Sequence, residues 1–159
     1  MSEATPVPTA APPQAPSAAS EVRAYRGLVR AQASLSRRLD AELERSHGIA
    51  LSSFEALQLL DEQPDGRMRM RDLAVEMNIS RSGLTRLVDR LARDGMIERC
   101  TCQHDARGAY ACLTAGGREL TEQARLTHRA VVRENLHSHL AGDELAALAE
   151  MCERIGASC

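Results

Sequence analysis

The chain has 159 residues, a length that suits one domain with a buried core. A hydrophobic content of 43% and a charged content of 26% are ordinary for a soluble protein, and a net charge of −2 excludes a uniformly basic nucleic-acid coat. The aromatic content of 2% excludes a stacking platform for single-stranded nucleic acid.

Positive charge is concentrated in one segment of the chain. From Arg67 to Arg107, nine arginines accompany six acidic residues, whereas the rest of the chain is net acidic. Because screening makes nearby charges dominate distant ones, such a segment still attracts phosphate. All 20 basic residues are arginines, whose planar guanidinium makes bidentate contacts that lysine cannot make. The alternative interpretation is a solvated charged face.

The N-terminal residues suggest neither secretion nor membrane insertion. They lack a basic segment followed by an apolar one, and no apolar run of the chain is long enough to span a bilayer. Five cysteines without a signal peptide suggest a reducing compartment, so we expect a cytoplasmic protein without a membrane partner. Residues 1–19 are rich in Pro and Ala and are expected to form a disordered tail.

Two helices are predicted after this tail. Apolar residues at helical spacing predict a long helix over residues 21–46 that stops at Gly48. A capping box from Ser52 to Glu55 predicts the start of a second helix, which ends before Pro64.

The next two helices are separated by a short turn. The third helix is expected over about 70–77, and Ser80 is the expected N-cap of a fourth helix that runs to about Arg93 and closes at Gly95. Apolar residues three and four apart form the inner stripe of this fourth helix, namely Leu84, Leu87, Val88 and Leu91. Charged and hydroxyl residues form its outer face, namely Arg81, Ser82, Thr85, Arg86, Asp89 and Arg90. Such side chains suit phosphates and base edges, so the helix has the layout of a recognition helix for the DNA major groove.

A hairpin follows the fourth helix. Residues 96–102 and 109–113 are strand-like and flank a loop at 103–108. Thr114 is the expected cap of a long helix over about 115–139.

A last helix is expected over about 142–155. The predicted fold is mainly α with a small β-hairpin wing, that is, a winged helix-turn-helix with long N- and C-terminal dimerisation helices. We divide it after the tail into an N-terminal dimerisation helix (20–48), a winged helix-turn-helix region (49–114) and C-terminal dimerisation helices (115–159). The flanking helices are amphipathic and would leave apolar surface exposed in one chain, which predicts a homodimer.

Short motifs in the helix-turn-helix and in the wing occur together in a family-specific order. The helix-turn-helix carries Leu73-Ala74, Ser80, Thr85-Arg86, Asp89, Leu91 and Gly95-Met96-Ile97, and the wing carries Asp105-Ala106-Arg107 and Leu113-Thr114. In these motifs the chain resembles the MarR family of bacterial transcription regulators over roughly residues 21–156. The resemblance implies a homodimer that binds a pseudo-palindromic operator in double-stranded DNA, usually as a repressor that a small-molecule effector or an oxidant releases.

The outer face of the fourth helix and the wing together supply the DNA-binding candidates. They are Arg81, Ser82, Thr85, Arg86, Arg90, Asp105 and Arg107. By the resemblance, Arg107 enters the minor groove, where narrow A·T tracts concentrate negative potential, and Asp105 holds its side chain. The resemblance also places an effector pocket between the dimerisation helices and the DNA-binding lobe, lined by parts of residues 21–62 and 115–140, where no diagnostic charge pair stands out.

Three cysteines, Cys100, Cys102 and Cys112, lie in the predicted hairpin, with His104 near its tip. If the loop turns about Ala106, Cys100 faces Cys112, close enough for a thiol pair or a metal site. Cysteine also packs as a small apolar residue, and no C-x-x-C pair is present. We favour packing or incidental thiols, and a thiol or metal sensor remains the alternative.

No enzyme, cofactor or metal site is predicted. The chain shows no Ser-His-Asp set, no paired carboxylates and no glycine-rich phosphate loop. His137 and His139 are two residues apart, which does not place them on one helix face. A winged-helix protein-interaction module is the alternative function, and the arginine at the wing tip argues against it.

Overall fold

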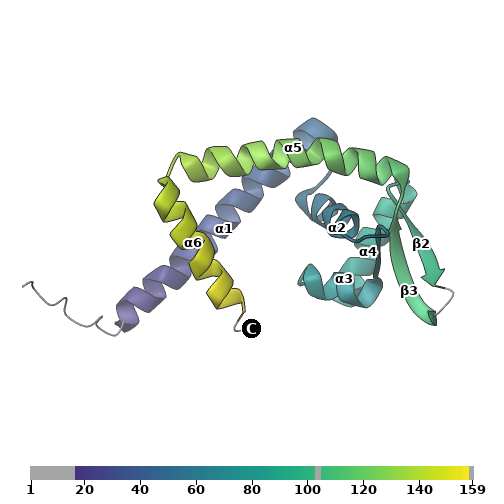
Figure 1. The fold of residues 1–159 in the computed structure, drawn as a ribbon, viewed down its shortest axis with the longest axis horizontal. Helices are drawn as coiled ribbons and strands as arrows, with labels where there is room; N and C mark the ends of the chain where they lie inside the picture. The colour runs from purple at the N-terminus through teal and green to yellow at the C-terminus, as the bar shows by residue number, and fades with distance from the viewer. Residues whose placement is uncertain (1–16, 103–104, 158–159) are drawn as a thin grey trace, which may run out of the picture. The chain divides into compact units, whose positions relative to one another are not determined.

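The computed structural model describes residues 17–102 and 105–157, without the side chains of residues 101–108. The described elements, in chain order, are α1 (Ala18–His47), α2 (Leu51–Asp61), β1 (Arg67–Arg69), α3 (Met70–Glu76), α4 (Arg81–Arg93), β2 (Ile97–Cys102), β3 (Asp105–Leu113), α5 (Ala115–His137) and α6 (Gly142–Gly156) (Figure 1). Mostly helical structure with a small antiparallel sheet confirms the predicted fold class. The chain divides into two compact units, residues 1–33 and 34–159, and α1 contributes to both.

The two parts of α1 differ in burial. In the first unit, this helix exposes four large apolar side chains, namely Val22, Tyr25, Leu28 and Val29. In the second unit, it buries Leu39 and Leu43 in a core cluster with Leu51 and Phe54 of α2 and Ala124 of α5. The C-terminal part of α1 is therefore a structural element of the second unit.

The N-terminus of α2 is capped by a residue from α1. The predicted capping box at Ser52 is wrong, because the N-cap is Ala50, which has no side-chain acceptor. Instead the Asp40 carboxylate accepts a hydrogen bond from the backbone N–H of Leu51 at 2.8 Å. This acceptor lies eleven residues before the helix start, outside the range of a local capping motif.

The helix-turn-helix follows the sequence prediction closely. The Ser80 hydroxyl accepts from the N–H of Gly83 at 3.1 Å, which confirms it as the N-cap of α4. Asn78 adopts a left-handed conformation with φ of 50°, which asparagine tolerates in a tight turn. The predicted inner face of α4 is buried at Leu84, Leu87, Val88 and Leu91. These side chains pack in the main core cluster against residues of α2, α3 and the sheet.

The wing is part of a three-stranded antiparallel sheet in the order β1-β3-β2. Strand β1 was not predicted, and β3 begins at Asp105, inside the segment expected to be loop. The predicted register is also wrong, because Cys100 pairs with Tyr110 and Cys112 pairs with Glu98. Ala111 and Ile97 face the core, so Cys100 and Cys112 lie on the outer face of the sheet.

The start of α5 is joined tightly to the base of the wing. As predicted, Thr114 is the N-cap, and its hydroxyl accepts from the N–H of Gly117 at 3.0 Å. The same hydroxyl lies 2.8 Å and 2.9 Å from the carbonyl oxygens of Gly95 and Met96, to which it donates. Gly117 is buried so close to this segment that a Cβ atom on it would lie 2.0 Å from the Met96 oxygen.

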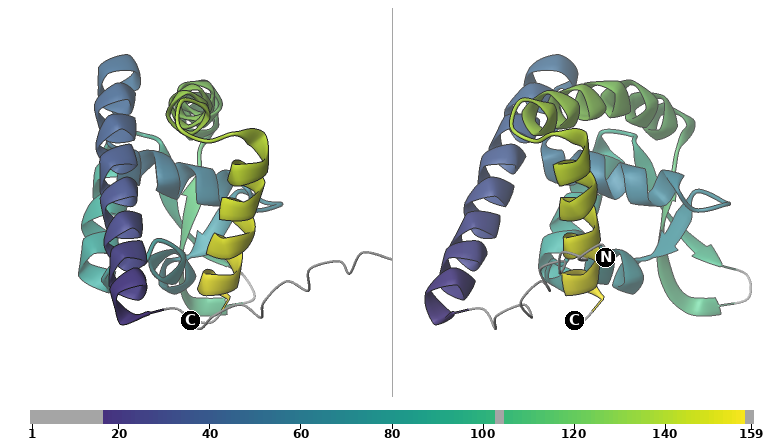
Figure 2. Two further views of the ribbon diagram at one scale, coloured as in Figure 1. Left: turned by 90° about the vertical axis from the view of Figure 1, so that its left-hand side faces the viewer. Right: turned by 60° about the vertical axis from the view of Figure 1, so that its left-hand side comes forward.

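The last helix, α6, turns away from the end of α5 (Figure 2). As expected for acidic residues in a first turn, the Glu144 carboxylate accepts from the N–H of Ala141 at 2.8 Å. The helix has no buried residue, and its Met151 and Ile155 side chains are exposed. Within residues 17–102 and 105–157, no helix is both long and apolar enough to cross a membrane.

Candidate nucleic-acid interface

The outer face of α4 carries five of the predicted DNA-binding side chains, and all five residues are exposed. They are Arg81, Ser82, Thr85, Arg86 and Arg90. The Thr85 hydroxyl donates to the carbonyl oxygen of Arg81 at 2.9 Å, which leaves its oxygen lone pairs for another donor. The Ser82 hydroxyl lies 3.2 Å from that of Ser80. The structure therefore brings these residues together on one solvent-facing surface.

Arg90 differs from the other four because it has a partner on another helix. Its guanidinium donates to the Ser53 hydroxyl of α2 at 2.9 Å. Ser53 is buried, with an exposed fraction of 3%. This contact joins α4 to α2, so Arg90 helps to hold the helix in place, a role that the spacing of residues along α4 did not reveal.

An ion pair joins α4 to the wing. The Arg99 guanidinium in β2 donates to the Asp89 carboxylate in α4 at 2.7 Å. Both side chains are about half exposed, so the pair contributes little to stability, about 0–1 kcal/mol. The pair matters more for the position of the wing, because it connects the outer face of α4 to β2, the first strand of the hairpin.

Two of the predicted DNA-binding residues, Asp105 and Arg107, belong to the wing. The side chains of Asp105 and Arg107, like that of Cys102, lie outside the described part of the structure. The backbone of Asp105 and Arg107 belongs to β3, which follows α4 and β2 in the chain.

A pocket of about 650 Å³ lies against α2, α5 and α6 in the second unit. Apolar, cationic and acidic side chains share its lining, namely Val132, Leu136, Leu145, Arg125, Arg129, Arg133, Asp61 and Glu62. Asp61, also in the lining, accepts hydrogen bonds from Arg118 and, at 2.7 Å, from Arg125. The expectation that no charge pair stands out in this region was wrong, because Asp61 and Arg125 form an ion pair here. The two residues are 64 positions apart, so their pairing is not visible in the sequence.

His128 lies at the side of this pocket and stacks on Phe54, with ring centroids 5.0 Å apart. Burial lowers the pKa of the His128 imidazole below its usual 6.5, and the nearby Arg129 charge lowers it further. The neutral imidazole is therefore the form that the folded chain favours. Within the described residues, no group of three or more His, Cys, Asp and Glu side chains could hold a metal ion.

We predict that the free energy of unfolding falls as the pH is lowered through about 6.5. Because the pKa of His128 is lower in the folded than in the unfolded chain, the unfolded chain takes up the proton first. Urea titrations at pH 7.5 and 5.8 would measure the change. His128→Leu should reduce this pH dependence, and an equal dependence in the variant would contradict the assignment to His128.

Comparisons with known proteins give a consistent family signal. Residues 47–108 match the model of the MarR family. The chain is 30% identical over 84 residues to the multiple antibiotic resistance protein MarR of Escherichia coli, and 34% identical over 76 residues to the HTH-type transcriptional repressor YetL of Bacillus subtilis. These alignments cover 53% and 48% of this chain, and 58% and 46% of those proteins, so the chain spans about half their length.

Similarity to a solved structure extends over nearly the whole chain. The crystal structure of Sco3205, a MarR family transcriptional regulator from Streptomyces coelicolor in complex with DNA, superposes with a TM-score of 0.79. The two sequences are 30% identical, and the match covers 93% of this chain and 91% of that chain. These similar proteins are regulators, in agreement with the prediction that the chain is not an enzyme.

Proposed function

This chain belongs to the MarR family of winged helix-turn-helix transcriptional regulators, and we propose that it represses transcription as a homodimer bound to a pseudo-palindromic operator. The proposal rests on the two faces of α4: the inner face is buried, and the outer face exposes arginines and hydroxyls. A helix held in this way can enter a major groove without rearrangement of the core. The name of the similar repressor YetL supports repression over activation.

Three residues of α4 are proposed to contact DNA directly. Ser82, Thr85 and Arg86 face the major groove or its phosphates, with Arg81 beside them at the start of the helix. Arg90 is proposed to act mainly through Ser53, by fixing the orientation of α4. In the wing, Arg107 enters the minor groove, and Asp105 positions it.

The homodimer is supported separately by each unit. The part of α1 in residues 1–33 exposes four large apolar side chains, and α6 in the second unit exposes Met151 and Ile155 and buries no residue. A two-fold partner that covers these helix faces would remove their apolar surface from water and would present two copies of α4 to DNA. Sedimentation equilibrium measures the mass, and a monomer at micromolar concentration would contradict the homodimer.

The proposal is tested by finding the bound DNA. Genomic footprinting of the full chain should recover one recurrent, two-fold symmetric sequence, and a duplex of that sequence should bind the purified chain far more tightly than a scrambled duplex at the same salt. Equal affinity for the two duplexes would contradict sequence-specific regulation. A chain that binds neither duplex would instead support the alternative of a protein-interaction module.

Arg107→Ala is expected to weaken binding to the operator by about 1–3 kcal/mol for each half-site. The loss should be greater for half-sites flanked by A·T pairs than for those flanked by G·C pairs, because a narrow minor groove attracts arginine more strongly. Fluorescence anisotropy at one fixed salt concentration measures both affinities. An unchanged affinity would contradict the role of the wing arginine.

The pocket against α2, α5 and α6 is proposed as the effector site. Arg129 and Arg133 offer positive charge, and Val132 and Leu136 offer apolar surface, so a small organic anion with an apolar body fits this lining.

Benzoate, a simple anion of this class, should therefore raise the melting temperature of the chain and lower its operator affinity. The double variant Arg129→Gln/Arg133→Gln should lose both responses, whereas Arg45→Gln, which removes an exposed arginine of α1, should keep them. Thermal melts and anisotropy with and without benzoate provide the comparison. Identical responses in the native chain and the double variant would exclude these arginines from the site.

A further inference from the structure

Two cysteines of the wing are joined across its strands. Cys100 in β2 and Cys112 in β3 form a disulfide, and their Cα atoms are 6.2 Å apart, within the usual range of about 4.4–6.8 Å. They are diagonal neighbours, because Cys100 lies directly opposite Tyr110 and Cys112 lies directly opposite Glu98. Diagonal residues on one face of an antiparallel pair come close enough to interact. The pairing thus follows from strand register and not from proximity in the sequence.

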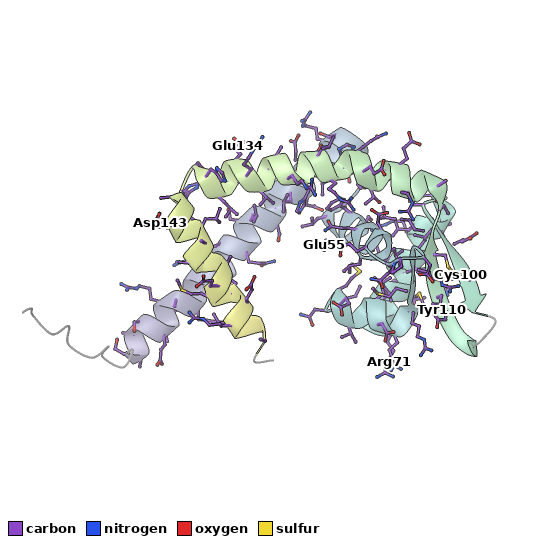
Figure 3. The ribbon with its side chains drawn as sticks, in the orientation of Figure 1. Glu55, Arg71, Cys100, Tyr110, Glu134 and Asp143 are labelled. Atoms are coloured by element: carbon purple, nitrogen blue, oxygen red, sulfur yellow. A yellow bond between two sulfur atoms is a disulfide. The ribbon has the colours of Figure 1, made fainter. Side chains whose placement is uncertain are left out.

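The disulfide lies outside the buried core. Both cysteines are only partly buried, and the strand register places them on the outer face of the sheet, opposite the face that packs on the core. Figure 3 labels Cys100 and Tyr110 at the hairpin. The neighbouring strand β1 places Arg67 opposite Cys112 and Arg69 opposite Tyr110. Arg67 pairs with the Asp65 carboxylate, and Arg69 donates to the Tyr110 hydroxyl at 2.7 Å, so the face that carries the disulfide is polar.

The cross-link spans the segment that carries the proposed minor-groove contact. The chain between Cys100 and Cys112 contains the backbone of Arg107. The residue before Cys100 is Arg99, whose guanidinium holds the Asp89 carboxylate of α4 at 2.7 Å. A change in how β2 lies on β3 would therefore reach both the wing tip and the outer face of α4.

We propose that Cys100 and Cys112 form a reversible thiol–disulfide switch that sets the affinity of the wing for DNA. The inference rests on the proposed DNA-binding function. The disulfide fixes β2 on β3 and so orders the wing before it meets DNA, which lowers the entropy lost on binding. Reduction removes this constraint and weakens binding.

The reaction partner is a low-molecular-weight disulfide. One cysteine thiolate attacks a sulfur of the reagent, forms a mixed disulfide and releases one reagent thiolate. The second cysteine thiolate attacks the protein sulfur of the mixed disulfide and releases the second reagent thiolate. In total, two cysteine thiols lose two electrons and two protons, and the reagent disulfide becomes two thiols.

The switch is tested on the full chain equilibrated in glutathione buffers of graded oxidised-to-reduced ratio. After rapid alkylation, peptide mapping should show a Cys100–Cys112 disulfide that forms and breaks with the buffer ratio. Operator affinity, measured in the same samples at fixed salt, should fall at least fivefold on reduction. Cys100→Ser and Cys112→Ser should bind like the reduced chain in every buffer, whereas Cys152→Ser, which removes an exposed cysteine of α6, should respond like the native chain.

The outcomes separate this inference from the proposed function. Equal operator affinity of the oxidised and reduced chain, or a map in which Cys100 and Cys112 never pair, overturns the switch and leaves DNA binding intact. Failure to bind DNA in both states overturns the proposed function and the switch together. Because the native chain alone supports the redox titration, the test holds even if a serine variant does not fold.

Discussion

Replacing Gly117 with alanine is expected to destabilise residues 34–159 by about 3 kcal/mol or more. A Cβ atom at this position would lie 2.0 Å from the carbonyl oxygen of Met96 and 2.8 Å from a methyl carbon of Leu113. The first obstacle is backbone, which cannot move aside as a flexible side chain does. To fit the methyl group, α5 must shift away from the base of the wing, and the hydrogen bonds from the Thr114 hydroxyl to the carbonyl oxygens of Gly95 and Met96 are then lost.

Gly116→Ala is the matched control, since a Cβ there would meet nothing closer than 3.9 Å. Alanine is a better helix former than glycine, so this variant should be as stable as the native chain or more stable, by up to about 1 kcal/mol. Urea unfolding followed by circular dichroism compares the three proteins. If the two variants unfold at the same urea concentration, the close approach of α5 to Met96 does not constrain the fold.

Arg86→Ala is expected to weaken operator binding by roughly 4 kcal/mol, which is about a 1,000-fold loss. The residue is exposed near the middle of the outer face of α4. A guanidinium contact to a base edge or phosphate contributes about 1–3 kcal/mol, and a homodimer loses it at both half-sites. If Arg86 reads a base, the variant should also tolerate substitutions at one position in each half-site.

Anisotropy titrations over a range of salt concentrations would measure this loss. Fewer phosphate contacts should make the dependence of affinity on salt shallower, whereas a lost base contact should leave that dependence unchanged. Arg45→Ala is the control, because it removes one exposed arginine from α1, where the partner is Glu42. Equal affinities of the two variants would mean that Arg86 contributes only net charge.

Local signals explain which parts of the fold the sequence predicted correctly. Ser80 and Thr114 each cap a helix through a residue three positions later, so a short motif was sufficient. The buried stripe of α4 likewise follows from spacing within one helix. The same periodicity predicts the outer face of α4, which is the part of the candidate interface that the recognition helix supplies.

The features that the sequence did not predict depend on contacts between distant segments. Strand β1 has only three residues and forms because Arg67–Arg69 pair with residues 110–112 of β3. Asp40 replaces the local cap of α2, and Ser53 gives Arg90 a partner 37 residues away. Such pairs are set by the tertiary fold, and without homologous sequences no pattern in the chain identifies them.

The tight attachment of the N-terminal end of α5 allows this helix to act as a lever. Its 23 residues form a rod of about 34 Å, fixed at Thr114 and Gly117 beside the wing and carrying His128 and Arg133 at the pocket. A tilt of about 5° about the fixed end would move the helix axis at His128 by about 1.5 Å, because that residue lies about 16 Å along the rod. A small molecule that binds between α5 and α2 and moves them apart would thus rotate α5 about its attachment to the base of the wing. Because Gly117 packs directly against Met96, the movement of α5 would displace this segment as well.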